Sequence, residues 1–96
     1  MNAKIIATAH STPKKILSNL DLEKIVDTSD DWIESRTGIK QRYIVENGEA
    51  SSDISTKIAE QLLIKSKISA DEIDLIIVGT VTPDHYTPST AALVQK

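Results

Sequence analysis

The sequence contains no cysteine and no phenylalanine, and its 96 residues include one tryptophan and two tyrosines. Without cysteine, the chain has no disulfide framework, no thiolate metal site and no cysteine nucleophile of its own. No stretch approaches the roughly 20 apolar residues that span a membrane, and the N-terminus lacks the order of charges and apolar residues seen in a signal peptide. The side chains also show no metal-binding spacing of histidine and carboxylates. We therefore expect a soluble, cytoplasmic protein with no metal site and no membrane partner.

Net charge and length limit the possible partners and the number of domains. The net charge is -3 and the isoelectric point is about 5.2, so no basic face for nucleic acid is predicted. A chain of this length fits one domain at most, spanning residues 1–96, and buries only about two-thirds of its unfolded surface. We expect a single small domain with a modest core.

Two apolar runs predict strands, at Ala3–Thr8 and at Asp74–Val81. The second run is almost continuously apolar or β-branched, as in a strand that is covered on both faces. Between them, Ser52–Lys67 repeats apolar residues every fourth position and predicts a helix of about 16 residues. The alternation of strand, helix and strand predicts an α/β organisation with a right-handed crossover.

Shorter elements fill the remaining chain. The predicted elements are a helix capped by Ser18 or Asn19 and continuing to Val26, an extended segment at Gln41–Val45, a turn at residues 46–49, a capped turn at residues 69–73, and a last helix at residues 91–95 after a Ser89 or Thr90 cap. His10 is interpreted as a polar surface residue, because no nucleophile is present to act with it. Asp84 and His85 are interpreted as part of a polar loop, because side chains next to each other in sequence on a loop rarely point at one another.

The lone tryptophan lies on a predicted short helix that begins after Thr28 or Ser29 and ends at Gly38. Trp32 and Arg36 are four residues apart and share one face of that helix. Two interpretations follow. The arginine can simply lie over the indole ring as packing, or the two flat groups can receive a flat ligand between them. The spacing alone favours packing.

Longer motifs point to a family. The chain is similar to the start of 3-oxoacyl-ACP synthase III, a thiolase-fold condensing enzyme, in residues 27–33 (DTSDDWI), in residues 36–39 (RTGI) and in Arg42. Residues 4–8, 75–80 and 88–95 are similar to the family's opening strand, a later strand and the helix that follows it. The resemblance covers nearly the whole chain, which ends at Lys96, well short of the family's length.

The resemblance implies an α/β, thiolase-like fold, of which this chain is the N-terminal part of the first βαβαβ half. It implies an acyltransferase that moves an acyl group from acyl-CoA to a catalytic cysteine and condenses it with malonyl-ACP to start fatty acid synthesis. The family's catalytic cysteine, histidine and asparagine would lie beyond Lys96, so no catalytic residue is assigned. The implied partners are acyl-CoA as substrate, acyl carrier protein and a second copy in a homodimer, with no separate cofactor.

The resemblance also assigns binding residues. It implies that Trp32 stacks on one face of the coenzyme A adenine and Arg36 on the other, with Thr28 and Thr37 hydrogen-bonding nearby at the mouth of the substrate tunnel. Many similar proteins have a phenylalanine where this chain has Thr87, on a loop that reaches across the dimer to the partner's acyl pocket. The smaller threonine implies room for primers longer or more branched than acetyl.

Two alternatives remain open. One is another thiolase-fold condensing enzyme that uses the same mouth for a different acyl donor. The other is a non-catalytic fragment or interaction module that keeps the scaffold without the chemistry. As the N-terminal part of a longer synthase, the isolated chain is expected to lack synthase activity and to expose a hydrophobic sheet edge that favours aggregation, swapping or pairing with the missing part.

Overall fold

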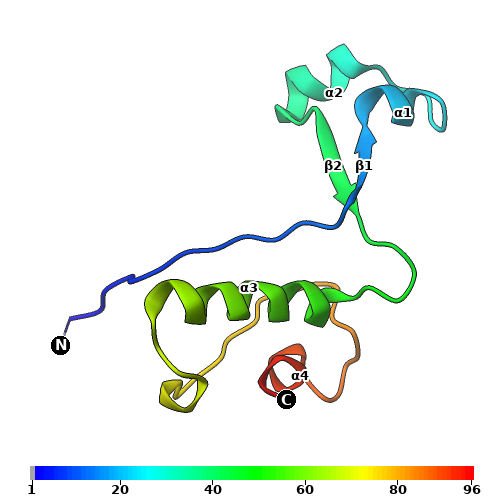
Figure 1. The fold of residues 1–96 in the computed structure, drawn as a ribbon. Helices are drawn as coiled ribbons and strands as arrows, with labels where there is room; N and C mark the ends of the chain where they lie inside the picture. The colour runs from blue at the N-terminus through cyan, green and yellow to red at the C-terminus, as the bar shows by residue number, and fades with distance from the viewer. Residues whose placement is uncertain (1) are drawn as a thin grey trace. The chain divides into compact units, whose positions relative to one another are not determined.

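The computed structural model describes residues 2–96, which form two compact units (Figure 1). The hairpin unit is Thr12–Asn47, and the long-helix unit combines residues 2–11 with Gly48–Lys96. The elements are β1 (Lys15–Ser18), α1 (Asn19–Glu23), α2 (Asp30–Thr37), β2 (Gln41–Ile44), α3 (Ser51–Ser66), the 3₁₀ turn η1 (Ala70–Glu72) and α4 (Thr90–Gln95). Each unit is described by itself.

The hairpin unit is built on a two-stranded antiparallel sheet. β1 pairs with β2 so that Lys15 lies opposite Ile44 and Ser18 lies opposite Gln41. The extended segment predicted at Gln41–Val45 is confirmed as β2, whereas β1 was not predicted. Four residues between Pro13 and a helix cap carry little period-two signal, so only pairing with β2 makes them a strand.

Both helices of this unit begin at serine caps. The Ser18 hydroxyl accepts a hydrogen bond from the Asp21 amide at 3.1 Å, which confirms the predicted start of α1. The predicted continuation to Val26 is wrong, because α1 ends at Glu23 and the amides of Ile25 and Val26 both turn back to the Leu22 carbonyl. Two amides share one carbonyl in a closing turn, so the helix does not continue.

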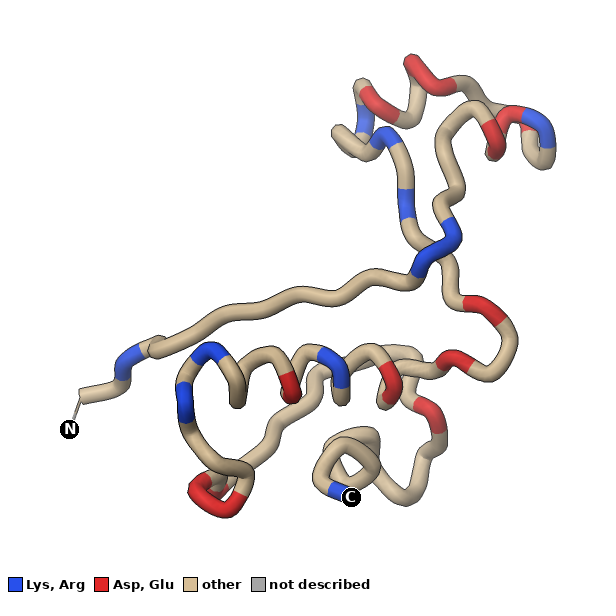
Figure 2. The backbone as a smooth tube through the Cα atoms, viewed as in Figure 1, with Lys and Arg blue, Asp and Glu red and all other residues tan. Residues whose placement is uncertain are grey.

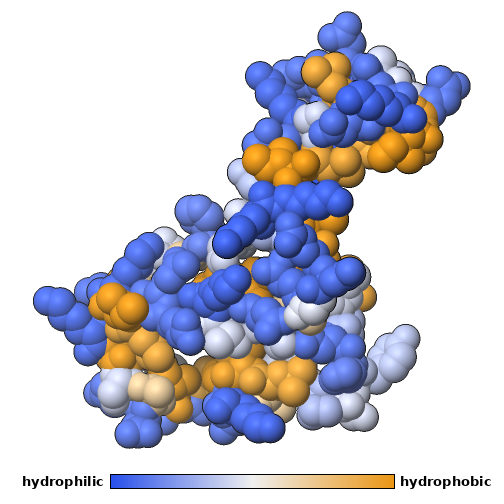
Figure 3. Space-filling model, turned by 45° about the vertical axis from the view of Figure 1, so that its right-hand side comes forward, coloured by the Kyte–Doolittle hydropathy of each residue, from blue (hydrophilic) through white to orange (hydrophobic). Residues whose placement is uncertain are grey.

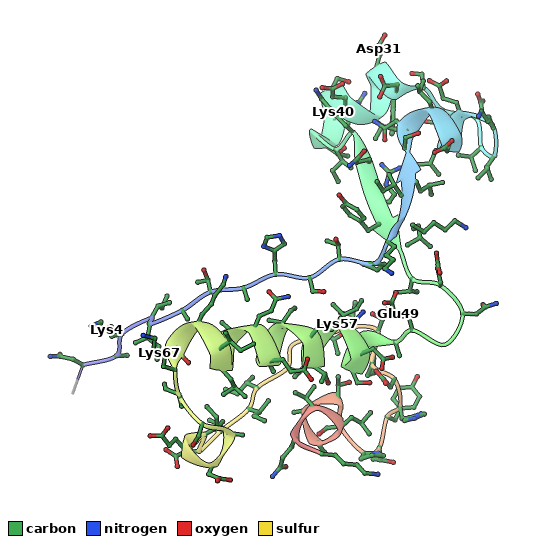
Figure 4. All side chains as sticks on the ribbon, in the orientation of Figure 1. Lys4, Asp31, Lys40, Glu49, Lys57 and Lys67 are labelled. Atoms are coloured by element: carbon green, nitrogen blue, oxygen red, sulfur yellow. The ribbon has the colours of Figure 1, made fainter. Side chains whose placement is uncertain are left out.

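The long-helix unit is organised around α3. The predicted helix at Ser52–Lys67 is confirmed within one residue at each end. The N-cap is Ala50, which has no capping side chain; its amide instead donates to the Asp53 carboxylate at 2.8 Å. Figure 4 shows Lys57 beside Glu49, with which it forms a partly exposed ion pair of 3.5 Å. Charged residues of both signs lie along this helix in Figure 2. The amphipathic pattern therefore predicted α3 well.

The turn at η1 and the helix α4 are also confirmed. The Ser69 amide donates to the Glu72 carboxylate at 2.9 Å, and Ser89 caps α4 by accepting from the Ala92 amide at 3.2 Å. α4 packs against α3. A further bond, from Lys65 Nζ to the Thr8 carbonyl at 2.9 Å, attaches the extended N-terminal segment to α3.

The two strands predicted at Ala3–Thr8 and Asp74–Val81 are wrong for this structure. Both segments are extended, but neither pairs with another strand in the described part of the chain. Their apolar side chains are not covered: Ile5 and Ile77 are each 83% exposed. A β-strand is completed by the hydrogen bonds of a neighbouring strand, and residues 2–96 supply none to these segments. The predicted parallel crossover is therefore absent from the described residues.

The core is smaller than predicted. Among the described residues no apolar side chain is fully buried, and the two buried residues are polar, Asn19 (1% exposed) and Thr90 (3% exposed). Ile64, an apolar residue of α3, is 78% exposed. Figure 3 shows hydrophobic surface on both units. No helix within residues 2–96 is long and apolar enough to cross a membrane, and this part of the chain brings together no metal-binding group of side chains.

Candidate functional site

The predicted binding pair lies on α2. Ser29 is the N-cap, and its hydroxyl accepts a hydrogen bond from the Trp32 amide at 3.1 Å. Gly38 ends the helix in the left-handed conformation, with φ of 70°, as predicted. α2 has no fully buried residue, and the Trp32 side chain is 56% exposed. The indole is therefore accessible to a ligand.

Arg36 lies over the Trp32 ring. The central carbon of its guanidinium is 5.4 Å from the ring centroid, which is cation–π geometry. A flat ring inserted between the two groups would need about 7 Å, two van der Waals separations of about 3.5 Å each. In the structure the pair is thus closed, as the packing interpretation predicted, and the guanidinium must move before a flat ligand enters between the two.

An open hollow of about 350 Å³ borders the tryptophan. Its lining residues are Asp27, Thr28, Ser29 and Trp32. This volume is in the lower part of the range of ligand pockets, about 300 to 1,000 Å³. The structure therefore brings Thr28 and Trp32 together on one concave surface, called here the Trp32 hollow.

Thr37 lies at the opposite end of α2 from Thr28. Its hydroxyl donates to the Ile33 carbonyl at 2.7 Å and accepts from the Ile39 amide at 3.1 Å. The single hydroxyl proton is already used, so this side chain can only accept a further hydrogen bond.

Acidic side chains surround this site. Asp30 and Asp31 lie in the first turn of α2, where the helix dipole favours negatively charged side chains. Figure 4 shows Asp31 pointing outward, and Lys40 forms an exposed ion pair with Glu34 at 3.5 Å. Arg36 supplies the positive charge next to the indole.

Asn19 fixes the base of α2. Its Nδ2 donates to the Asp30 carboxylate at 2.9 Å and to the Ile39 carbonyl at 2.7 Å, and its Oδ1 accepts from Arg42 at 2.7 Å. The sequence pointed to Asn19 only as an alternative helix cap, and to Arg42 only as part of a family motif. Partners 11 to 23 residues away leave no local signal.

The loop that carries Thr87 belongs to the long-helix unit. Residues 81–87 line an open hollow of about 640 Å³. The Ser51 hydroxyl donates to the Thr82 carbonyl at 2.7 Å, and the Asp84 carboxylate accepts from both the amide and the hydroxyl of Ser52. These bonds to Ser52 hold the pKa of Asp84 below its ordinary value. Asp84 therefore anchors the loop to the first turn of α3, a role that sequence reasoning missed.

Similarity to known proteins now bears on these residues. Beta-ketoacyl-[acyl-carrier-protein] synthase III of Streptococcus agalactiae serotype III is 59% identical over 93 residues, which is 97% of this chain. The chain is a homologue of beta-ketoacyl-[acyl-carrier-protein] synthase III. It spans 28% of that relative's length. No protein-family model matches the chain.

Solved structures agree with this homology. The crystal structure of the synthase III from Aquifex aeolicus has a TM-score of 0.90 and 51% identity, covering 96% of this chain and 30% of its own. The priming beta-ketosynthase of the R1128 polyketide pathway has a TM-score of 0.88 and 27% identity, covering 96% of this chain and 28% of its own. The predicted α/β, thiolase-like fold class of this synthase III homologue is therefore confirmed.

The similarity in fold extends to the segments that are unpaired here. The match to the A. aeolicus synthase has a TM-score of 0.90 and covers 96% of the chain, so it includes most of these two segments. Residues 3–8 and 74–81 are extended, although the described residues provide no strand beside them. The prediction was wrong about pairing and burial within this chain.

Proposed function

We propose that this chain is part of a 3-oxoacyl-ACP synthase III, a condensing enzyme that joins an acyl group from acyl-CoA to malonyl-ACP at the start of fatty acid synthesis. The observation that carries the proposal is 59% identity along 97% of the chain to a synthase III. The proposed whole enzyme is a cytoplasmic homodimer that binds acyl-CoA and acyl carrier protein and needs no separate cofactor.

The proposed role of this part is to bind the adenine of coenzyme A on α2. Trp32 offers an exposed aromatic face, Thr28 lines the hollow beside it, and Arg36 supplies a positive charge suited to the phosphates. Thr37 has one accepting position left for the ligand. These features support the binding set Thr28, Trp32, Arg36 and Thr37.

Opening the Trp32–Arg36 pair costs little compared with the energy of binding. An exposed cation–π contact contributes about 0.5 to 1 kcal/mol. Even a ligand with a dissociation constant of about 1 mM gains about 4 kcal/mol. Because adenine would restore a stacking contact to each side chain, the closed pair is compatible with the proposed adenine sandwich.

The test uses the single tryptophan as a reporter. Titrating the chain with coenzyme A should quench or shift the Trp32 fluorescence, whereas pantetheine, which lacks adenine, should not. Replacing Arg36 with Gln should weaken the response, and replacing the exposed Lys15 with Gln should leave it unchanged. Equal responses to coenzyme A and pantetheine, or none to either, would refute the adenine site.

Catalysis is proposed to need residues that this chain does not contain. The 96 residues hold no cysteine, and the family's acyl transfer requires one as the nucleophile. We expect the isolated chain to show no condensation of acyl-CoA with malonyl-ACP. Condensation by the purified 96 residues would contradict the proposed mechanism.

The proposal extends to substrate choice at Thr87. This residue lies on the loop of residues 81–87. By the family resemblance the loop reaches the partner's acyl pocket, where threonine would fill less space than the phenylalanine of many similar proteins. The intact synthase is expected to accept primers longer or more branched than acetyl, because the smaller side chain leaves more room for the primer. Replacing Thr87 with Phe should shift the preference toward acetyl-CoA. Use of acetyl-CoA alone by the unmodified enzyme would contradict this expectation.

A second candidate is another thiolase-fold condensing enzyme with a different acyl donor. It is favoured by the similarity to a priming ketosynthase of polyketide synthesis. The two candidates differ in the product formed with malonyl-ACP and a panel of acyl donors. A fragment or interaction module without catalysis is the remaining alternative, and it predicts no product from the intact protein.

A further inference from the structure

The position of α2 depends on one buried side chain. Asn19 is 1% exposed, and both protons of its amide group are donated, one to Asp30 and the other to the Ile39 carbonyl. Asp30 is the first residue of α2, and Ile39 follows its C-cap, Gly38. A single amide nitrogen therefore holds the helix at both of its ends.

Gly38 makes this double contact possible. Its φ of 70° turns the chain back at the end of α2, so the Ile39 carbonyl returns to the same side chain that holds Asp30. The residue after Ile39 also contacts Asn19, because the backbone N–H of Asn19 donates to the Lys40 carbonyl at 3.0 Å. Asn19 thus joins the start of α1 to both ends of α2.

Apolar packing holds α2 only in part, because Ile33 is half-buried and no residue of the helix is fully buried. Its polar attachments to residues outside the helix and its caps are those of Asn19, one bond from the Asp30 amide to Glu23 at 2.7 Å and the exposed ion pair of Glu34 with Lys40 at 3.5 Å. The side-chain amide of Asn19 is itself held in place, because Arg42 donates a hydrogen bond to its oxygen, Oδ1. A buried polar group with every partner satisfied specifies one geometry.

We propose that Asn19 is a positioning residue, whose two-ended contact with α2 sets the surface that Trp32 and Arg36 present to a ligand. The inference rests on the proposed function only for the identity of that ligand, coenzyme A. The hold on α2 itself is measured without any ligand.

The experiment compares two replacements of Asp30 in the 96-residue chain. Asp30→Asn and Asp30→Ala both remove the negative charge at the start of α2, but only Asn keeps an oxygen that accepts from Asn19. Amide hydrogen exchange at pH 7 compares α2 with the paired strands β1 and β2. We expect faster exchange in α2 and a shifted Trp32 emission maximum for Asp30→Ala, with Asp30→Asn close to the unmodified chain.

Coenzyme A binding provides the second readout. Losing one hydrogen bond that positions the site should weaken binding about tenfold in Asp30→Ala and leave Asp30→Asn nearly unchanged. If the unmodified chain does not bind coenzyme A, the proposed function fails, and hydrogen exchange still decides the role of Asn19.

Three results would overturn the inference. One is equal exchange in α2 for the two variants. Another is exchange that rises as much in β1 and β2 as in α2, because the bond would then stabilise the whole hairpin unit rather than position one helix. The last is equal coenzyme A binding by the two variants when the unmodified chain binds it.

Discussion

Replacing Arg42 with Met should destabilise the hairpin unit more than most single replacements on a surface strand do. Arg42 lies on β2, and its guanidinium donates to Asn19 Oδ1 at 2.7 Å and to the Leu17 carbonyl at 3.3 Å. Methionine keeps much of the apolar stem and removes both donors. Asn19, being buried, then has an oxygen without a partner.

The expected cost follows from these two bonds. A bond from a charged donor to a buried acceptor contributes about 1.5 to 3 kcal/mol, and the longer bond to Leu17 adds little. We therefore expect the free energy of unfolding to fall by about 2 kcal/mol. With an m-value near 1 kcal/mol per molar urea for so small a unit, the urea midpoint should fall by about 2 M.

The assay is urea unfolding followed by tryptophan fluorescence, since Trp32 lies in the hairpin unit and is the sole tryptophan. Lys15→Met is the matched control, because Lys15 is an exposed cation on β1 with the same change of charge. A change of this kind should cost no more than about 0.5 kcal/mol. If Arg42→Met lowered the midpoint only as much as Lys15→Met, the reasoning about the Asn19 contacts would be refuted.

Three further changes test other parts of the structure. Gly38→Ala should destabilise the hairpin unit by about 1 to 2 kcal/mol in the same urea assay, because φ is 70° there and no neighbouring atom limits the space; an unchanged midpoint would contradict this. The bonds from Ser52 lower the pKa of Asp84 in the folded state, so their stabilisation is present above pH 3.8 and is lost as pH falls through the lower folded value. The amide shift of Ser52 in NMR should therefore titrate below pH 3.8, and an inflection at or above 3.8 would argue against the anchor. Thr90→Val should leave the thermal midpoint unchanged or raise it, since the buried Thr90 hydroxyl has no hydrogen-bond partner in the described residues; a clear fall would show that the hydroxyl is satisfied.

Local signals were enough for the elements that depend on neighbouring residues. The caps at Ser18, Ser29 and Ser89 and the left-handed Gly38 are interactions within one helical turn, and a side chain three residues from an amide can be recognised from sequence. The stripe of α3 was equally readable, because its period repeats over four turns.

The family and its fold class were also readable from the sequence. The resemblance depends on the order of residues 27–39 and not on the overall amino-acid composition. It agrees with the similarity to known synthases. The binding roles of Thr28, Trp32, Arg36, Thr37 and Thr87 stay predictions. The structure adds that the first two share a hollow and that Arg36 rests on the indole ring.

Contacts between distant residues were decided only by the tertiary structure. The sequence by itself determined where the helices start and stop, the amphipathic pattern of α3 and the short motifs that mark the family. Each of these depends on residues within a few positions of each other. Strand pairing, the clamp of Asn19 on α2 and the anchor of Asp84 on Ser52 join residues 11 to 32 positions apart. Apolar runs at residues 3–8 and 74–81 specify a tendency to be extended, but a strand also needs a neighbour's hydrogen bonds, and no residue within a run can supply them.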